Sequence, residues 1–174
     1  AFLPGGKDML VTERAGNLRL VNAEGKVGPS ISGVPKVWAE GQGGLLDVAL
    51  SPEFGKDRTV YLSYAEEGSD GKAGTAVGRG QLSEDRARLE NFTVIFRQQP
   101  KLSVGNHFGS RLAFAPDGTL FVTQGDRYSQ KDGAQTLDND FGKTVRIHPD
   151  GSIPTDNPFV KTPGARPEIW SYGH

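Results

Sequence analysis

A short turn that contains a proline precedes a β-rich segment at three separate places in the chain. The prolines are Pro4, Pro52 and Pro116, and each is followed by a run rich in valine, leucine, threonine or aromatic residues. Proline fixes the φ angle of the turn and nearby glycines tolerate positive φ, so each unit predicts two short strands joined by a hairpin. Units of four short strands that recur about every 40–50 residues are typical of β-propeller blades. The repeat therefore predicts an all-β protein built of such blades.

The composition supports this fold class. The chain has 24 Gly and 11 Pro among 174 residues, and both residues disfavour helix interiors. A hydrophobic content of 35% is compatible with one packed core at this length. An irregular β-sandwich with similar turns is the alternative. At about 45 residues per blade, the chain has enough residues for roughly three to four blades.

Charge and cysteine content exclude several function classes. The net charge of −1 gives no electrostatic reason to expect nucleic acid or an anionic membrane as a partner. No apolar run is long enough for a membrane span. The absence of cysteine excludes disulfides, thiolate metal sites and cysteine nucleophiles.

Two segments are less regular than the rest. The glycine-rich stretch 66–80 is interpreted as a long loop that leads into a strand, and its glycines match neither a phosphate loop nor a dinucleotide fingerprint. The polar stretch 129–140 is expected to form a loop on one face of the propeller disc. Within it, Asp138, Asn139 and Asp140 lack the spacing of a calcium loop and predict a polar turn.

Among the three histidines, His107 has the most informative setting. It lies in a turn flanked by Gly105 and Gly109, immediately before a predicted strand. Imidazole titrates near neutral pH, so a histidine held at such a loop tip is a candidate general base. A histidine that only bonds a neighbouring carbonyl is the alternative. His148 adjoins a hairpin turn and is expected to be solvated, while the setting of His174 stays open.

A carboxylate and an amide complete the candidate set. Asp126 follows the strand that comes after the His107 strand, so a hairpin would bring the two residues together and let the carboxylate orient the imidazole. The alternative for Asp126 is an ordinary turn cap. Gln42 lies between Gly41 and Gly43, and such glycines permit close approach to a flat ligand. A plain flexible loop is the alternative for this segment.

At these same residues the sequence resembles the soluble sugar dehydrogenases that use pyrroloquinoline quinone (PQQ), particularly the aldose sugar dehydrogenases. The matching segments occur in family order across nearly the whole chain. They are residues 38–48, 71–78, 100–103, 105–109, 151–159 and 168–173.

The resemblance implies a six-bladed propeller with PQQ over its central channel, and the oxidation of aldoses at the anomeric hydroxyl. In that family the histidine that matches His107 is the general base, and the carboxylate that matches Asp126 orients it. The resemblance assigns Gln42 to the cofactor. It further implies that Asn106 contacts the sugar and that Tyr128 lines the substrate mouth.

The resemblance also implies that residues 1–174 are the N-terminal half of a single propeller domain, about three blades. Both ends look like cuts through folded structure. The calcium ligands and further cofactor-binding residues of the family are expected in the other half, so no metal ligand is expected in this chain. The expected partners are an aldose, an electron acceptor, and the complementary half or another copy. A periplasmic location follows from the resemblance alone.

Two other functions stay open. The first is a propeller-like binding module without catalysis, which recognises sugar or protein through its loops. It predicts no quinone spectrum and a harmless His107→Ala change. The second is a related quinoprotein that acts on another polyol such as sorbosone, and substrate profiling would distinguish it.

Overall fold

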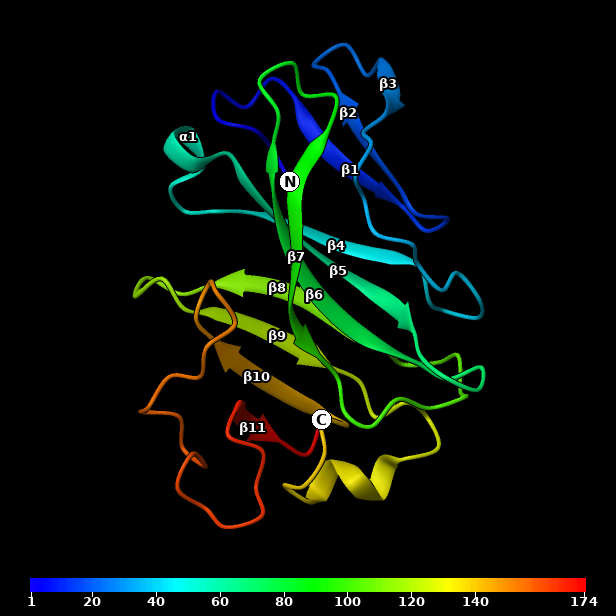
Figure 1. Cartoon of the computed structure of the whole chain (residues 1–174), viewed down its shortest axis with the longest axis vertical. Helices are drawn as coiled ribbons and strands as arrows, with labels where there is room; N and C mark the ends of the chain where they lie inside the picture. Colours follow the sequence, from blue (N-terminus) through cyan, green and yellow to red (C-terminus); the bar gives the residue numbers. More distant parts are fainter.

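The computed structural model describes residues 1–174 and contains three antiparallel sheets that follow one another along the chain (Figure 1). The first sheet is formed by β1 (Met9–Glu13), β2 (Asn17–Val21) and β3 (Val27–Ser30). The second is formed by β4 (Leu45–Leu50), β5 (Thr59–Glu67), β6 (Ala73–Leu82) and β7 (Leu89–Arg97). The third is formed by β8 (Gly109–Phe114), β9 (Leu120–Gln124), β10 (Lys143–Ile147) and β11 (Ile169–Tyr172). Within each sheet the strands neighbour one another in sequence order.

Helical structure is confined to two short pieces. They are the single turn α1 (Phe54–Asp57) and the 3₁₀ segment η1 (Lys131–Gln135). Neither has the length or the apolar character that a membrane-spanning helix needs. The prediction of an all-β protein is confirmed.

The three proline-containing turns occupy equivalent places in the three sheets. The turn at Pro52 joins β4 to β5, and the turn at Pro116 joins β8 to β9. In the first sheet a β-bridge between Phe2 and Met9 places the turn at Pro4 in the same relation to β1. The repeat found in the sequence therefore corresponds to a structural repeat.

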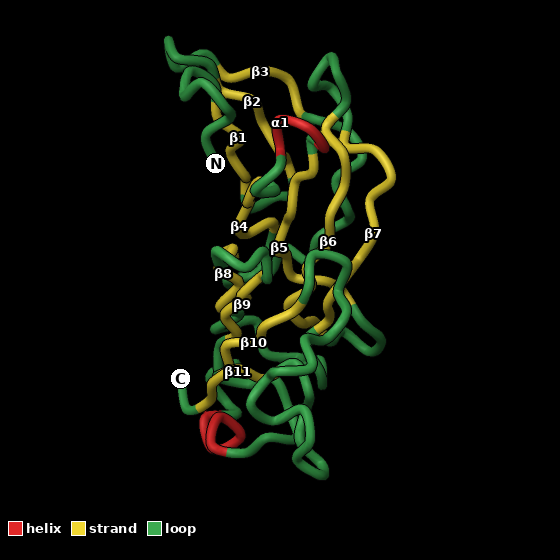
Figure 2. Tube along the Cα trace, turned by 90° about the vertical axis from the view of Figure 1, so that its left-hand side faces the viewer, coloured by secondary structure: helices red, strands yellow, loops and turns green.

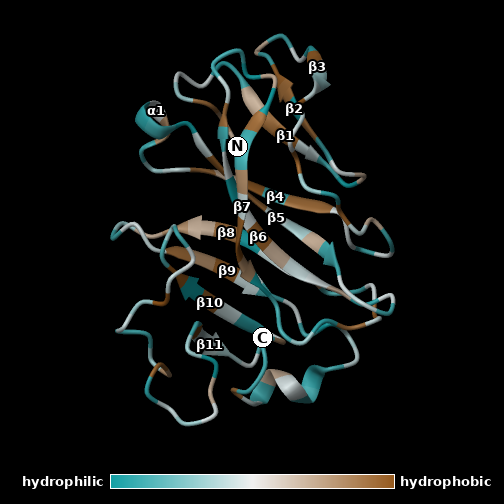
Figure 3. Ribbon diagram, in the orientation of Figure 1, coloured by the Kyte–Doolittle hydropathy of each residue, from teal (hydrophilic) through white to brown (hydrophobic).

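The sheets are stacked in series, with β1 beside β4 and β4 beside β8 (Figures 1 and 2). Side chains of β5 alternate between two cores: Leu62 and Tyr64 pack toward the first sheet, while Tyr61 packs toward the third. The middle sheet is thus buried on both faces. Figure 3 shows apolar segments in brown in each of the three sheets, in β2, β4 and β9. Three sheets in series exclude the alternative of a two-sheet β-sandwich and have the arrangement of propeller blades.

The interpretation of residues 66–80 as a long loop is wrong. Strand β5 continues to Glu67 and β6 begins at Ala73, so only residues 68–72 connect them. The glycines of β6 serve packing: a Cβ on Gly78 would lie 2.4 Å from the ring of Phe92. Glycine is used here because side chains of the next strand cover the backbone closely. The polar stretch 129–140 is a connection between β9 and β10, as expected, and includes η1.

Antiparallel pairing divides the loops between two edges of the stack. Segments 38–44, 68–72, 98–108 and 125–142 lie at one edge, which we call the His107 edge. The three proline-containing turns lie at the opposite edge. All the candidate site residues belong to the His107 edge.

Candidate functional site

His107 is fixed at the end of the connection between the second and third sheets. Its backbone has a φ of 50°, an uncommon conformation for a residue other than glycine. Its backbone N–H donates a 2.8 Å hydrogen bond to Oε1 of Gln42. Its ring atom Nδ1 lies 2.7 Å from Oδ1 of Asp126. The structure thus brings together the three residues that the sequence singled out.

Hairpin pairing explains why Asp126 reaches His107. Gly109 at the start of β8 pairs with Gln124 at the end of β9, so residues just before β8 and just after β9 meet. Gly125 makes the approach possible, because a Cβ there would lie 2.0 Å from the carbonyl oxygen of His107. The expected hairpin juxtaposition is therefore present.

The hydrogen bond between Asp126 and the His107 ring determines which ring nitrogen carries the proton. Hydrogen bonds from His107 and from the backbone N–H of Tyr128, opposed in part by burial, keep the pKa of Asp126 below its usual value of 3.8. An ionised carboxylate can only accept, so Nδ1 of His107 carries the proton. Nε2 then presents a lone pair, and the side chain is 45% exposed. A substrate hydroxyl can approach a base of this kind directly.

The Gln42 loop is built on close backbone contact with the His107 loop. The Gln42 N–H donates to the Gly105 carbonyl at 2.7 Å, and a Cβ on Gly41 would lie 2.5 Å from that same oxygen. Because Oε1 of Gln42 accepts from His107, the amide Nε2 is left to donate elsewhere. Gln42 is exposed and can offer this donor beside the imidazole.

Two arginines that the sequence reasoning missed hold these loops. Arg14, in the β1–β2 turn, donates to the carbonyls of Ala39 at 3.0 Å and Gly41 at 2.7 Å. Arg127, next to Asp126, is fully buried and donates to the carbonyl of Asn106 at 2.9 Å. No local sequence signal separates them from ordinary surface arginines.

The two predicted substrate residues also flank His107. Tyr128 is 69% exposed, and its ring stands edge-on to the imidazole at a centroid distance of 5.6 Å. Asn106 directly precedes His107 and is half-buried. Tyr128 is therefore placed to meet a ligand that reaches Nε2.

The two remaining histidines lie at different edges of the stack. His148 is exposed and follows β10, whose end lies at the opposite edge. His174 follows β11 at the His107 edge, where its backbone N–H donates to the Gly142 carbonyl at 3.1 Å and its Nε2 lies 2.8 Å from the Ser171 hydroxyl. The expectation of a solvated His148 is confirmed.

Acidic residues are not grouped as a metal site would require. No cluster of three histidine, aspartate or glutamate side chains in the chain has the geometry to hold a metal ion. The carboxylate of Asp138 accepts hydrogen bonds from Thr136 and Asn139, as in the predicted polar turn.

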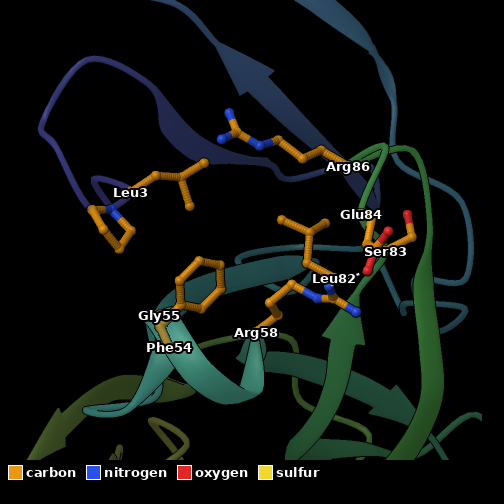
Figure 4. A pocket seen from close by; sticks show the side chains of 9 residues that line it. Leu3, Phe54, Gly55, Arg58, Leu82, Ser83, Glu84 and Arg86 are labelled. Carbon is orange, nitrogen blue, oxygen red and sulfur yellow. Dashed lines mark hydrogen bonds and ion pairs between the residues drawn. The ribbon is translucent and has the colours of Figure 1, made fainter.

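A hollow near the opposite edge carries no comparable chemistry (Figure 4). Its wall includes Leu3, Phe54 and Leu82. Its two arginines are already paired, Arg58 with Glu84 at 3.1 Å and Arg86 with Asp8 at 2.7 Å. The hollow contains neither a histidine nor an unpaired acid, so the candidate site is the His107 group.

Comparison with known proteins agrees with the fold. A family model described as glucose/sorbosone dehydrogenase matches residues 1–174. The chain is 55% identical over 173 residues to the aldose sugar dehydrogenase YliI of Escherichia coli K12. The alignment covers 99% of this chain and 46% of that protein.

Solved structures show the same relationship. A glucose dehydrogenase crystal structure superposes with a TM-score of 0.96 and 58% identity, covering 100% of this chain and 50% of that one. The PQQ-bound aldose sugar dehydrogenase of Streptomyces coelicolor superposes with a TM-score of 0.83 and 33% identity, covering 99% and 48%. The chain spans about half the length of these relatives. It belongs to the glucose/sorbosone dehydrogenase family, as its sequence resemblance indicated.

Proposed function

We propose that these residues form the catalytic-base part of a PQQ-dependent aldose dehydrogenase that oxidises the anomeric hydroxyl of a sugar to a lactone. The observation that carries the proposal is the geometry of His107. Asp126 fixes its ring at 2.7 Å, Gln42 fixes its backbone at 2.8 Å, and Nε2 is left open. Membership of a dehydrogenase family supports this reading of the geometry.

In this mechanism His107 Nε2 takes the proton of the anomeric hydroxyl. The charge that develops on the imidazole is stabilised by Asp126, which stays ionised because its pKa is lowered. A positioned base of this kind typically contributes a factor of about 10²–10⁴ to the rate. Tyr128 and Asn106 flank the base and are proposed to contact the sugar.

The residues present fit one edge of a flat quinone. Gln42 is exposed beside His107 and can offer its Nε2 donor, while its flanking glycines pack closely against Gly105 and Trp38 and hold the loop in place. PQQ, when bound, supplies the acceptor for the hydride that leaves the sugar carbon. Gln42 would hold it by donating to a quinone oxygen.

The completed site is proposed to need more than these residues. Because relatives are about twice as long, we propose that residues 1–174 are the N-terminal half of one propeller domain. The complementary half or a second copy would supply the calcium ligands and the other cofactor contacts. The complete protein would oxidise aldoses in the periplasm and pass the electrons to an external acceptor.

A dye-linked assay tests the proposal. The full-length protein that carries these residues is incubated with PQQ, Ca²⁺, an aldose and an electron-accepting dye, with a matched sample lacking PQQ. The proposal expects dye reduction only when PQQ is present. Failure of the full-length protein to bind PQQ or to reduce the dye with any aldose would contradict it and favour a non-catalytic binding module. Turnover confined to another polyol would instead favour the sorbosone-type alternative.

A further inference from the structure

Arg127 is a fully buried arginine whose hydrogen-bond partners are all uncharged. Nε donates to the Asn106 carbonyl at 2.9 Å. One terminal nitrogen donates to the carbonyl of Ala73 at 2.9 Å and to Oε1 of Gln98 at 3.1 Å, and the other donates to the carbonyl of Val104. Its exposed fraction is 0% and no carboxylate pairs with it. Burial of an unpaired cation costs free energy, so the presence of a buried arginine here needs a structural or functional reason.

The environment of Arg127 is built to hold the guanidinium in one orientation. Its central carbon lies 3.9 Å from the centre of the Phe108 ring, a distance at which a cation is attracted to the ring face. Arg127 and Tyr128 have φ angles of 53° and 61°, in the left-handed region that favours glycine. Two such residues in succession cost free energy, and backbone strain of this kind is concentrated at functional sites.

The residues that contact Arg127 come from two parts of the fold, the loop that carries His107 and the edge of the middle sheet. Val104 and Asn106 precede His107 in that loop, and Phe108 follows it. Ala73 and Gln98 belong to the second sheet, at the start of β6 and just after β7. One side chain therefore ties the loop that carries His107 to the rigid middle sheet. Desolvation lowers the pKa of Arg127 to about 10, so the guanidinium stays charged at neutral pH.

Asp126 and Arg127 act on the same residue from two directions. Asp126 bonds the His107 ring, and Arg127 bonds the backbone immediately before it. We propose that Arg127 is a positioning residue for His107, which holds the imidazole in reach of Asp126 and of the substrate hydroxyl. The kinetic part of this inference rests on the proposed function, whereas the structural part concerns the His107–Asp126 hydrogen bond alone.

The first test measures that hydrogen bond in the full-length apo-protein. The Nδ1 proton and nitrogen of the His107 ring are observed by NMR in wild type and in Arg127→Met and Arg127→Lys variants. Lysine keeps the charge but has neither the planar fork nor the five donors of arginine. We expect the hydrogen-bonded Nδ1–H signal in wild type and its loss in both variants. Retention of that signal in a folded Arg127→Lys protein would overturn the inference, even if Arg127→Met fails to fold.

The second test asks whether Arg127 acts through His107. Arg127→Lys is expected to lower kcat at least about tenfold, as small displacements of a catalytic group do, with little change in KM. In a His107→Ala background the same change is expected to have no further effect on kcat, because coupled residues are not additive. Equal losses in both backgrounds would overturn the inference.

Arg146 provides a matched control. It is also buried and stacked on an aromatic ring, 5.1 Å from Trp170, but it pairs with Asp117 and Asp156 away from His107. Arg146→Lys should lower thermal stability and leave the His107 signal and kcat unchanged. If wild type lacks dehydrogenase activity, the proposed function fails, while the NMR result still decides the role of Arg127.

Discussion

The side-chain oxygen of Gln42 accepts a 2.8 Å hydrogen bond from the backbone N–H of His107. The two residues are 65 positions apart and enter the site from segments that precede β4 and β8, the first strands of neighbouring sheets. A displacement of either loop is therefore transmitted to the other. This one hydrogen bond links Gln42, which we propose binds the quinone, to His107, the proposed base.

Replacement of Gln42 by glutamate separates the two functions of this side chain. Glutamate can still accept from the His107 N–H but cannot donate to a quinone oxygen. We expect weaker PQQ binding, by about tenfold for a lost hydrogen bond left unsatisfied, measured by titrating apo-protein with PQQ. Gln81→Glu, exposed on β6, serves as the control. Unchanged PQQ affinity in Gln42→Glu would disprove the assignment of Gln42 to the cofactor.

Asp126→Asn should impair catalysis without unfolding the protein. An amide can donate to Nδ1 of His107, which would move the imidazole proton to Nε2 and remove the lone pair that faces the substrate. We expect kcat to fall by about 10²–10⁴-fold, the usual contribution of a general base. Steady-state kinetics measure it, with Asp132→Asn in η1 as the exposed control. An unaltered kcat would show that Asp126 is only a turn cap.

A methyl group at Gly125 should disturb the base through the backbone. The added Cβ would lie 2.0 Å from the His107 carbonyl oxygen, so the two strand ends must separate. We expect Gly125→Ala to lower the free energy of unfolding by about 1–3 kcal/mol, as overpacking does, and to lower kcat as well. Gly55→Ala, where no atom lies within 4 Å, should have little effect on either. Equal unfolding midpoints for the two variants would contradict this prediction.

The buried carboxyl of Asp140 should make stability depend on pH. Burial raises its pKa from 3.8 to about 7, although Arg166 opposes the rise and Glu168 adds to it. The folded state then binds a proton that the unfolded chain releases, so this group's contribution to stability is greatest at low pH. It is lost as pH rises from about 4 through about 7.

Denaturant unfolding at several pH values measures this effect. Between about pH 5 and about pH 8, wild type should lose more stability than Asp140→Asn, because the variant lacks the titrating group. The Asp140 side chain accepts a 2.8 Å hydrogen bond from Arg166, so the comparison uses slopes with pH rather than absolute stabilities. Parallel slopes for the two proteins would refute the prediction.

The fold was predictable because its signals are local. Proline-containing turns and short β-rich runs determine hairpins within a few residues, and the turns at Pro52 and Pro116 occupy equivalent places in two sheets. The same hairpin logic predicted the approach of Asp126 to His107. The glycine content of residues 66–80 wrongly predicts a long loop, because Gly78 and Gly80 lie within β6 and are covered by side chains of β7, which composition does not reveal.

The rest of the site depends on contacts between distant segments. The hydrogen bond from His107 to Gln42 joins two sheets, and Arg127 is buried only because the Ala73, Gln98 and Asn106 segments converge on it. Arginine is usually exposed, so the sequence alone favours a surface position for Arg127. Its role emerges only from the folded arrangement.

The central claim is that His107 is the base of a PQQ-dependent sugar oxidation, and a pair of histidine variants tests it most directly. His107→Ala and the exposed control His148→Ala are compared in the full-length protein for PQQ binding and for aldose-dependent dye reduction. The account predicts that both variants bind PQQ, that His148→Ala keeps the wild-type kcat, and that His107→Ala loses about 10²–10⁴-fold in kcat. A wild-type kcat in His107→Ala would contradict the account.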